Sequence, residues 1–270
     1  MSYRLAVIGV GNMAKAVLTG IQRSNVDVAE IYLFDKNSEQ YNDLSQDNCN
    51  YIFCNTVYGA VEKADCVLLA VKPQNYSDVL SQISQVPKHN EKIYITIAAG
   101  ITVQHVSQAL NGAKVVRVLP NLPMTVGSGV SVICKNPLVG DTEFSFVTSL
   151  FSSSGSTMLI DEVEMNRIIG VTSSSPAYVF KFIDAMAKAA TTQGLPEEGI
   201  IDAICDVFIG SALLLKSSKE SPETLINRVC SKGGTTEQAI NKLNEANVDN
   251  IILEAMLACT QRADELGKDE

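Results

Sequence analysis

Histidine is scarce in this sequence, which has only His89 and His105 among its 270 residues. Both histidines lie in polar stretches that we expect to be exposed. A catalytic triad built on histidine, or a metal site with histidine ligands, is therefore not expected. This shortage favours chemistry that an organic cofactor supplies.

The sequence also lacks an excess of positive charge and long apolar runs. The formal net charge is −9, which argues against a nucleic-acid partner or a polybasic membrane surface. No apolar run approaches the roughly 18–20 residues that a membrane-spanning helix needs. The first residues lead directly into an apolar strand, so a signal peptide is not expected.

The cysteines show no spacing typical of a metal or redox site. There are seven of them, an odd number, and none forms a Cys-x-x-Cys pair. This pattern predicts reduced thiols that mostly fill the core, and hence a cytoplasmic location. The cysteines are at positions 49, 54, 66, 134, 205, 230 and 259.

The hydrophobic pattern changes near residue 161. Before it, short apolar runs alternate with helical periodicity, which predicts a doubly wound α/β domain over residues 1–161. After it, helical periodicity alone continues, which predicts an all-α domain over residues 162–270. Its helices are apolar over more than one stripe, so we expect them to bury a second face against another copy of the chain. The expected helices there include Pro176 to Gln193, Ile200 to Leu215, one opening at Pro222, and Val248 to Leu266.

A glycine turn near the start is the first candidate site. The run Gly9-Val10-Gly11-Asn12-Met13-Ala14 follows an apolar strand, Tyr3–Ile8, and opens a helix. Gly9 permits a tight turn, Gly11 lets a pyrophosphate approach the backbone, and Ala14 allows close packing of helix on strand. The helix N-terminus adds free N–H groups and a positive dipole. Candidate cofactor residues here are Ile8, Gly9, Val10, Gly11, Asn12, Met13 and Ala14.

Two further candidates follow the next strands. Asp35 comes after Ile31–Phe34, where a carboxylate can accept hydrogen bonds from the adenosine ribose and repel a 2′-phosphate, which favours NAD. Lys36 could hold a 2′-phosphate instead, and the alternative for Asp35 is a turn residue that ends the strand. Asn55 either caps the helix that begins near Thr56 or reaches the adenine or ribose.

Other strand ends carry polar or small residues where ligands of open α/β sheets bind. The strand from Cys66 ends in Ala70-Val71-Lys72-Pro73-Gln74, of which Lys72 and Gln74 can meet cofactor or substrate. The small residues Ala98, Ala99 and Gly100 either let a nicotinamide ring lie close to the backbone or serve helix packing. Asn121, between two prolines, can both donate and accept a hydrogen bond.

The last candidate is the loop Ser231-Lys232-Gly233-Gly234-Thr235-Thr236-Glu237, which precedes a helix starting near Thr236. Paired glycines there can point several N–H groups one way and form an anion nest for one carboxylate. The alternative is a flexible loop whose threonine caps the helix.

Together these segments resemble the pyrroline-5-carboxylate reductase family. The resemblance covers nearly the whole chain and is most specific in its later motifs. The matching segments are Gly9 to Ala14, Ala70 to Gln74, Ile97 to Ile101, Arg117 to Pro123, Pro176-Ala177-Tyr178 and Gly233-Gly234-Thr235-Thr236. The resemblance implies a Rossmann-type dinucleotide-binding domain followed by an all-α dimerisation domain.

The resemblance also implies an activity and a site. It implies the reduction of 1-pyrroline-5-carboxylate to proline with NADPH or NADH, in a homodimer that can assemble to a decamer. The substrate carboxylate would dock on the N–H groups of Gly234, Thr235 and Thr236, and the Thr236 hydroxyl would bond the imine nitrogen as the catalytic group. Other substrate-binding residues that it implies are Val229, Ser231, Gly233 and Ser174.

Two segments depart from the family pattern. Ser173-Ser174-Ser175 stands where the family usually has Gly-Ser-Gly, and Lys232 stands where it usually has proline. Two alternatives therefore accompany the reductase hypothesis. One is a dehydrogenase that acts on another imine or a hydroxy acid, and the other is a nucleotide-binding relative without catalysis.

Overall fold

The computed structural model describes residues 2–24, 26–42, 44 and 50–266. The chain folds into two compact units, residues 1–174 with 258–270, and residues 175–257. Cys49 lies outside the described residues.

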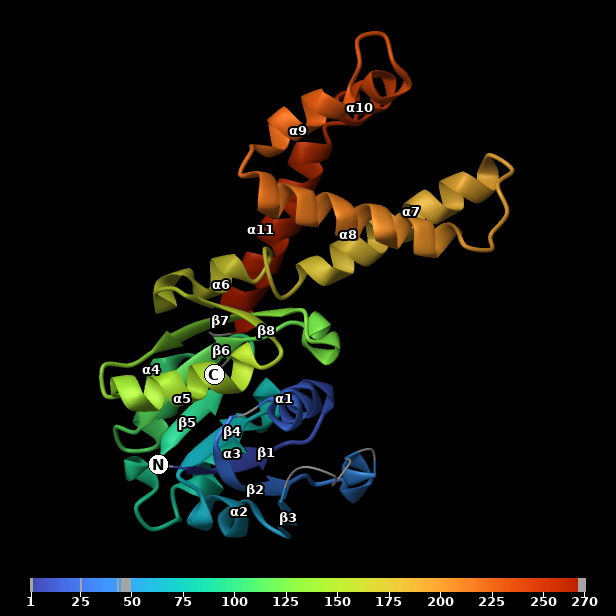
Figure 1. Cartoon of the computed structure of the whole chain (residues 1–270). Helices are drawn as coiled ribbons and strands as arrows, with labels where there is room; N and C mark the ends of the chain where they lie inside the picture. Colours follow the sequence, from blue (N-terminus) through green and yellow to red (C-terminus); the bar gives the residue numbers. More distant parts are fainter. Residues whose placement is uncertain (1, 25, 43, 45–49, 267–270) are drawn as a thin grey trace. The chain divides into compact units, whose positions relative to one another are not determined.

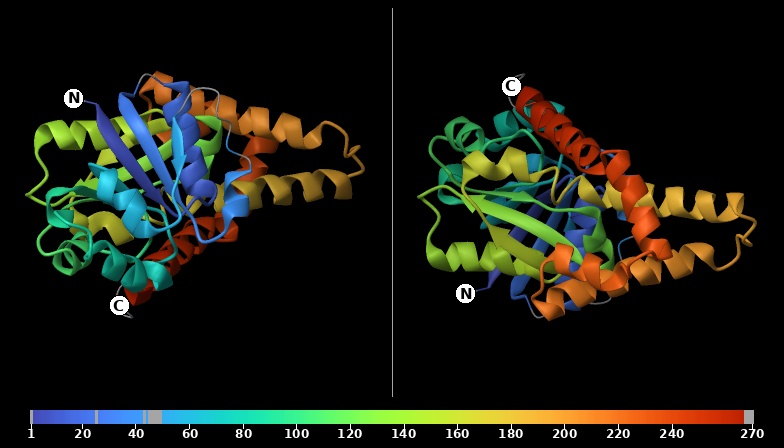
Figure 2. Two further views of the ribbon diagram at one scale, coloured as in Figure 1. Left: turned by 90° about the horizontal axis from the view of Figure 1, so that it is seen from below. Right: turned by 90° about the horizontal axis from the view of Figure 1, so that it is seen from above.

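The first unit is built on an eight-stranded sheet in the order β3-β2-β1-β4-β5-β6-β7-β8 (Figures 1 and 2). All neighbouring strands are parallel except β6 and β7. The strand order reverses between β1 and β4, which creates the crevice where ligands of such sheets bind. The strands are β1 Tyr3–Ile8, β2 Val28–Phe34, β3 Tyr51–Phe53, β4 Cys66–Leu69, β5 Ile93–Thr96, β6 Lys114–Leu119, β7 Gly129–Lys135 and β8 Gly155–Leu159.

Helices cover both faces of the sheet, which confirms the doubly wound α/β domain. Successive residues of β1 point to opposite faces, so Leu5 and Val7 join one buried core and Ala6 and Ile8 the other. Residues of α1 and α5 pack in the first core, and residues of α2, α3 and α4 in the second. The helices of this unit are α1 Asn12–Arg23, α2 Val57–Lys63, α3 Tyr76–Ile83, α4 Val103–Ala109, α5 Asp141–Ser152 and α6 Met165–Ile168, with 3-10 turns η1 Ser38–Tyr41, η2 Pro73–Asn75, η3 His89–Glu91, η4 Leu122–Val126 and η5 Glu162–Glu164.

A buried arginine ties β6 to the C-terminal segment. The Arg117 side chain is only 1% exposed, and its Nη2 donates to Asn166 Oδ1 at 2.8 Å. Asn166 in turn donates to Asp264 Oδ1 at 2.8 Å, on the last turns of α11. Burial lowers the pKa of Arg117, although arginine starts so high that it stays charged. Among the described residues, Arg117 Nε has no hydrogen-bond partner.

The second unit is helical. Its helices are α7 Ser175–Thr192, α8 Ile200–Ser218, α9 Pro222–Val229, α10 Thr235–Glu245 and the start of α11 Val248–Leu266, whose last turns belong to the first unit. Pro222 opens α9 as expected. Helix α8 ends three residues later than Leu215, because Lys216, Ser217 and Ser218 continue it up to Lys219, whose φ of 59° ends the helix.

This unit lacks a core of its own. Of residues 175–257, all of which the structure describes, only Ile204 is buried. Large apolar side chains are exposed along α7, α8, α9 and α11, as the expected second apolar stripe requires. They include Phe180, Phe182, Ile201, Val207, Ile209, Leu213, Ile226, Val229, Ile251 and Leu257.

Candidate functional site

The glycine turn lies at the carboxyl end of β1, beside the reversal of strand order. Gly9 has a φ of +92°, and a Cβ built there would lie 2.8 Å from the Ala70 carbonyl oxygen. A side chain at this position is therefore excluded by both conformation and contact. Gly9 also donates its N–H to Phe34 O at 2.8 Å, so the turn is held against β2 and β4.

Gly11 is different, because open space lies in front of it. It is the N-cap of α1, with a φ of −78° and no side-chain cap. A Cβ built on Gly11 would meet no atom within 4 Å. The first N–H groups of α1 lack partners within the helix, so this space suits a phosphate. The residues present therefore fit a dinucleotide pyrophosphate.

A pocket of about 400 Å³ adjoins this turn. It is formed by the ends of β1, β2 and β4 together with η2. Eight of its lining residues are ones that the sequence singled out as cofactor residues: Ile8, Gly9, Gly11, Asp35, Lys36, Ala70, Val71 and Lys72. Gln74 was also expected at this edge. The other lining residues are Phe34, Gln40, Asn75 and Val79, which sequence reasoning missed.

Asp35 makes a contact that its position in the sequence did not reveal. One carboxylate oxygen accepts the Val10 N–H at 2.7 Å, and the other accepts the Asn37 N–H at 2.9 Å. The Asp35 N–H donates to the Tyr41 hydroxyl at 2.6 Å. Asp35 therefore fastens the glycine turn to the end of β2. Each carboxylate oxygen has a second lone pair with which it can meet a ribose hydroxyl.

Other cofactor candidates in the first unit do not line this pocket. Asn55 does not cap α2, because Thr56 is the N-cap and accepts the Gly59 N–H. Asn121 is buried, its amide donates to Thr172 O at 3.1 Å, and its oxygen accepts the Val130 N–H at 2.8 Å. The segment 98–100 follows β5, with Gly100 at a φ of +85°. The cofactor roles of Asn55, Pro73, Ala98, Ala99, Gly100 and Asn121 stay predictions. The same holds for Val10, Asn12, Met13 and Ala14, which do not line the pocket either, and for the eight predicted residues that do line it.

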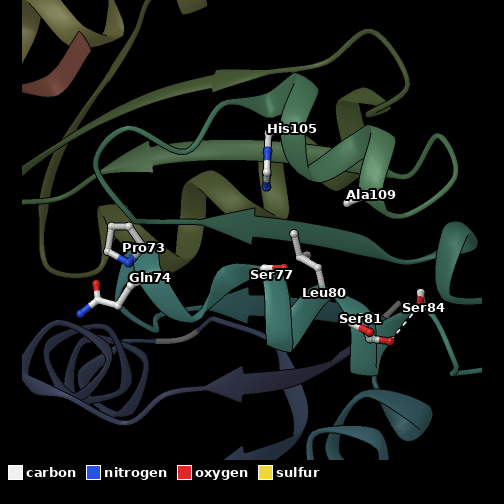
Figure 3. Close-up of a pocket in the computed structure, with 8 residues that line it drawn as sticks. All are labelled: Pro73, Gln74, Ser77, Leu80, Ser81, Ser84, His105 and Ala109. Carbon is white, nitrogen blue, oxygen red and sulfur yellow. Dashed lines mark hydrogen bonds between the residues drawn. The ribbon is translucent and has the colours of Figure 1, made fainter. Parts of the chain in front are cut away.

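A second hollow in this unit, of about 520 Å³, lies between α3 and α4 (Figure 3). Ser77 and Ser81 line it from α3 and Ser84 from the C-cap of that helix, and His105 and Ala109 line it from α4. Gln74 lines this hollow and the pocket beside the glycine turn. Apart from Pro73 and Gln74, none of the residues that the sequence singled out for binding lies here.

The loop before α10 lies in the second unit and is partly closed by its own hydrogen bonds. The Gly233 N–H donates to Glu237 Oε2 at 2.8 Å, and the Gly234 N–H donates to Ser231 O at 2.9 Å. In this structure the Gly234 N–H is therefore already bonded within the loop, and its expected use for a ligand carboxylate stays a prediction. The N-cap is Gly234 rather than a threonine, and α10 begins at Thr235.

Thr235 and Thr236 are the donors that remain for a carboxylate at this loop. They occupy the first two positions of α10, where backbone N–H groups lack partners within the helix. Thr236 also lines a hollow of about 500 Å³ with Val229 and Cys230 and with apolar residues of α8, α9 and α10. Ser231 and Lys232 are exposed beside it. Ser174 is the last residue of the first unit before the chain enters the second.

Neither a metal-binding cluster nor a membrane-spanning helix is found among the described residues. In the part of the chain that the structure describes, no three metal-ligating side chains gather at one place. No described helix is both long and apolar enough to cross a membrane. The six described cysteines are free thiols.

Comparisons with known proteins agree with this geometry. Residues 4–100 match the family model of the coenzyme F420-dependent NADP oxidoreductases, and residues 162–266 match that of pyrroline-5-carboxylate reductase dimerisation. The chain is 32% identical over 270 residues to the pyrroline-5-carboxylate reductase of Escherichia coli strain K12, which covers 99% of this chain and 100% of that protein.

Solved structures are similar over the same length. A pyrroline-5-carboxylate reductase from Coxiella burnetii has a TM-score of 0.88 at 26% identity, covering 98% of this chain and 99% of that one. A pyrroline carboxylate reductase from Plasmodium falciparum, solved with NADP bound, has a TM-score of 0.86 at 24% identity and covers 98% of both chains.

Gly11→Val tests whether the open space in front of Gly11, called here the phosphate cradle, binds the pyrophosphate. The new side chain fills the open space in front of the turn, so we expect the Kd for NADH and NADPH to rise at least about tenfold. The matched control is Gly140→Val, because Gly140 is the N-cap of α5 at a φ of −71° and lies outside the pocket. Both variants lose a similar amount of capping energy. Equal dinucleotide affinity of the two variants contradicts the assignment.

Asp35→Ser tests the choice of cofactor. Removing the carboxylate removes its repulsion of a 2′-phosphate, so we expect the ratio of NADPH to NADH affinity to rise by about tenfold. Loss of the bond to the Val10 N–H weakens both cofactors alike and leaves that ratio unaffected. Glu39→Ser, which removes an exposed carboxylate outside the pocket, is the control. An unchanged ratio in Asp35→Ser means that this residue only fastens the turn.

Proposed function

Because the chain belongs to the pyrroline-5-carboxylate reductase family, we propose that it reduces 1-pyrroline-5-carboxylate to L-proline, the last step of proline biosynthesis. The observation that carries this proposal is the match to the E. coli enzyme along the whole chain. The open cradle at Gly11 supports it independently, because it supplies a dinucleotide site that the reaction needs.

The cofactor is NADPH or NADH, and the first unit supplies the residues to hold it. We propose that the N–H groups at the start of α1 bind the pyrophosphate, and that Asp35 and Lys36 face the adenosine ribose. The segments after β4 and β5, residues 70–73 and 98–100, then receive the nicotinamide half. When bound, the reduced nicotinamide supplies a hydride to the imine carbon, and one further proton completes the amine.

The substrate carboxylate is proposed to bind at the start of α10. The N–H groups of Thr235 and Thr236 and the dipole of an 11-residue helix favour a negative charge there. The Thr236 hydroxyl is proposed to hydrogen-bond the imine nitrogen and the amine that forms from it. We propose that orientation of the reactants and the chemistry of the cofactor carry most of the rate, which fits the absence of histidine from both candidate sites.

The chain forms a homodimer through its helical segment, and we propose that dimers assemble further to a decamer. The apolar side chains exposed along the helices of residues 175–257 support the dimer, since nothing within this unit covers them. Free thiols at the described cysteines support the proposed location in the reducing cytoplasm.

The direct test of this function measures oxidation of NADPH and of NADH by the purified protein with 1-pyrroline-5-carboxylate. We expect turnover with at least one cofactor and formation of proline. Turnover with a different imine or a hydroxy acid alone supports the dehydrogenase alternative. Dinucleotide binding without any turnover supports a relative that has lost catalysis.

The assembly is tested by analytical ultracentrifugation at micromolar concentration. We expect a species of at least two chains, because residues 175–257 bury almost none of their apolar side chains alone. A monomer at that concentration contradicts the dimer.

Thr236→Val tests the proposed catalytic hydroxyl. Valine keeps the shape and removes the donor, and a hydrogen bond to a charged group contributes about 1.5–3 kcal/mol. We therefore expect kcat/KM to fall by about 10- to 150-fold. Dinucleotide affinity should remain near that of the unmodified protein, because the residues proposed to hold the cofactor lie in the other unit.

The control for this variant is Thr224→Val on α9. The Thr224 hydroxyl bonds Ser221 at 2.9 Å, outside the loop that precedes α10. Full kcat/KM in Thr236→Val removes the proposed role of its hydroxyl. Loss of cofactor binding alone assigns the loop to the nucleotide instead.

A further inference from the structure

A buried hydroxyl bridges the carboxyl ends of β4 and β5. Tyr76 is the first residue of α3 and is 1% exposed. Its hydroxyl donates to Leu69 O at 3.0 Å and lies 2.8 Å from Thr96 Oγ1. Leu69 is the last residue of β4, Thr96 is the last residue of β5, and the two are paired in the ladder. One side chain thus holds both strands at the point where they end.

The protons at this bridge can be assigned. A phenol has one proton, and the Leu69 carbonyl can only accept, so the Tyr76 proton goes to Leu69. The Thr96 hydroxyl therefore donates to the Tyr76 oxygen. Thr96 is fully buried, so its hydroxyl has no solvent to replace this partner. Removal of the Tyr76 hydroxyl takes this partner from the buried Thr96 hydroxyl, and removal of the Thr96 hydroxyl takes the bond that it donates to Tyr76.

The bridge lies where the hydrogen-bond ladder between β4 and β5 ends. The last ladder bond between β4 and β5 runs from the Ile97 N–H to Leu69 O and is 3.4 Å long. On the other side of β4, the last bond to β1 runs from the Ala70 N–H to Ile8 O at 2.8 Å. Strands β4 and β5 therefore begin to part at this point, and the Tyr76 hydroxyl gives the Leu69 oxygen its second hydrogen bond.

The residues that follow the bridge are proposed cofactor residues. Leu69 directly precedes Ala70, whose carbonyl oxygen lies 2.8 Å from where a Cβ of Gly9 would be. Thr96 precedes Ile97 and the segment 98–100. Tyr76 itself follows η2, where Gln74 and Asn75 line the pocket beside the glycine turn. Its neighbour Ser77 lines the other hollow, between α3 and α4 (Figure 3).

We propose that Tyr76 is a positioning residue for the nicotinamide half of the cofactor, acting through the Leu69 carbonyl and the Thr96 hydroxyl. This role rests on the proposed function, which places that half of the cofactor at residues 70–73 and 98–100. The adenosine ribose is proposed to face Asp35 and Lys36 at the end of β2, whereas the two hydrogen bonds of the Tyr76 hydroxyl go to the ends of β4 and β5. Loss of the bridge therefore affects one half of the dinucleotide and spares the other.

The experiment compares a whole cofactor with a truncated one. The ligands are whichever of NADH and NADPH binds the unmodified protein more tightly, and its counterpart without nicotinamide, ADP-ribose or 2′-phospho-ADP-ribose. Calorimetric titration of Tyr76→Phe should show a Kd for the whole dinucleotide raised about tenfold, with the Kd of the truncated ligand changed less than about twofold.

Tyr94→Phe is the matched control. Tyr94 is fully buried on β5, and its hydroxyl donates to His89 O at 2.9 Å, near the opposite end of that strand. This variant also removes one buried hydroxyl from a tyrosine. We expect it to lower the melting temperature, as Tyr76→Phe does, without changing either Kd.

Thr96 supplies variants that leave the tyrosine in place. Thr96→Val removes the other hydroxyl at constant shape and should reproduce the selective loss, whereas Thr96→Ser keeps the hydroxyl and should restore affinity for the whole dinucleotide. These variants keep the test informative even if Tyr76→Phe folds poorly.

Three results overturn the proposal. They are unchanged affinity for the whole dinucleotide in Tyr76→Phe, equal weakening of whole and truncated ligands, and the same selective loss in Tyr94→Phe. If the unmodified protein binds no dinucleotide, the proposed function fails together with this role. If it binds dinucleotide and reduces the imine but the variants show no selective loss, only the role of Tyr76 fails.

Discussion

The close approach of β1 and β4 at Gly9 is the constraint on which the first unit depends. A Cβ at Gly9 would lie 2.8 Å from the Ala70 carbonyl oxygen, so the two strand ends meet with no side chain between them. The chain then turns at once into α1, and the first N–H groups of that helix face the open space at Gly11. Because the strand order reverses at this pair of strands, the narrow contact and the open cradle lie side by side.

The second unit has the opposite problem. It buries too few of its apolar side chains, whereas the strand ends at Gly9 in the first unit leave no room for a side chain. Only Ile204 is buried in residues 175–257, while α7, α8, α9 and α11 expose apolar side chains. Conformational entropy opposes the ordering of these helices, and burial within the single chain offsets little of it. A second copy supplies the missing apolar surface. The loop before α10 therefore connects helices whose stability depends on the assembly of two chains.

Patterns within short segments of the sequence predicted most of the fold. The features that they missed depend on contacts between residues in different parts of the fold. Short apolar runs predicted the strands, and the spacing of Gly9 and Gly11 predicted the phosphate site at the start of α1. Both patterns involve only residues that are close together in the sequence. The sequence could not show that Asp35 accepts the Val10 N–H, since this bond joins residues on two different strand ends. Nor could it show that the Gly234 N–H already donates to Ser231 O, because a sequence does not reveal which backbone N–H groups have a hydrogen-bond partner.

Backbone N–H groups at the starts of α1 and α10 are the donors proposed to bind cofactor and substrate, so the hydrogen bonds that orient these groups matter for the function. The direction of a backbone N–H is set by the bonds around it, such as Asp35 at Val10 and Glu237 at Gly233. A shift at the end of a strand therefore also shifts the backbone N–H groups of the turn that follows it. Residues that never touch a ligand, including Tyr76, then determine how well the ligand is held.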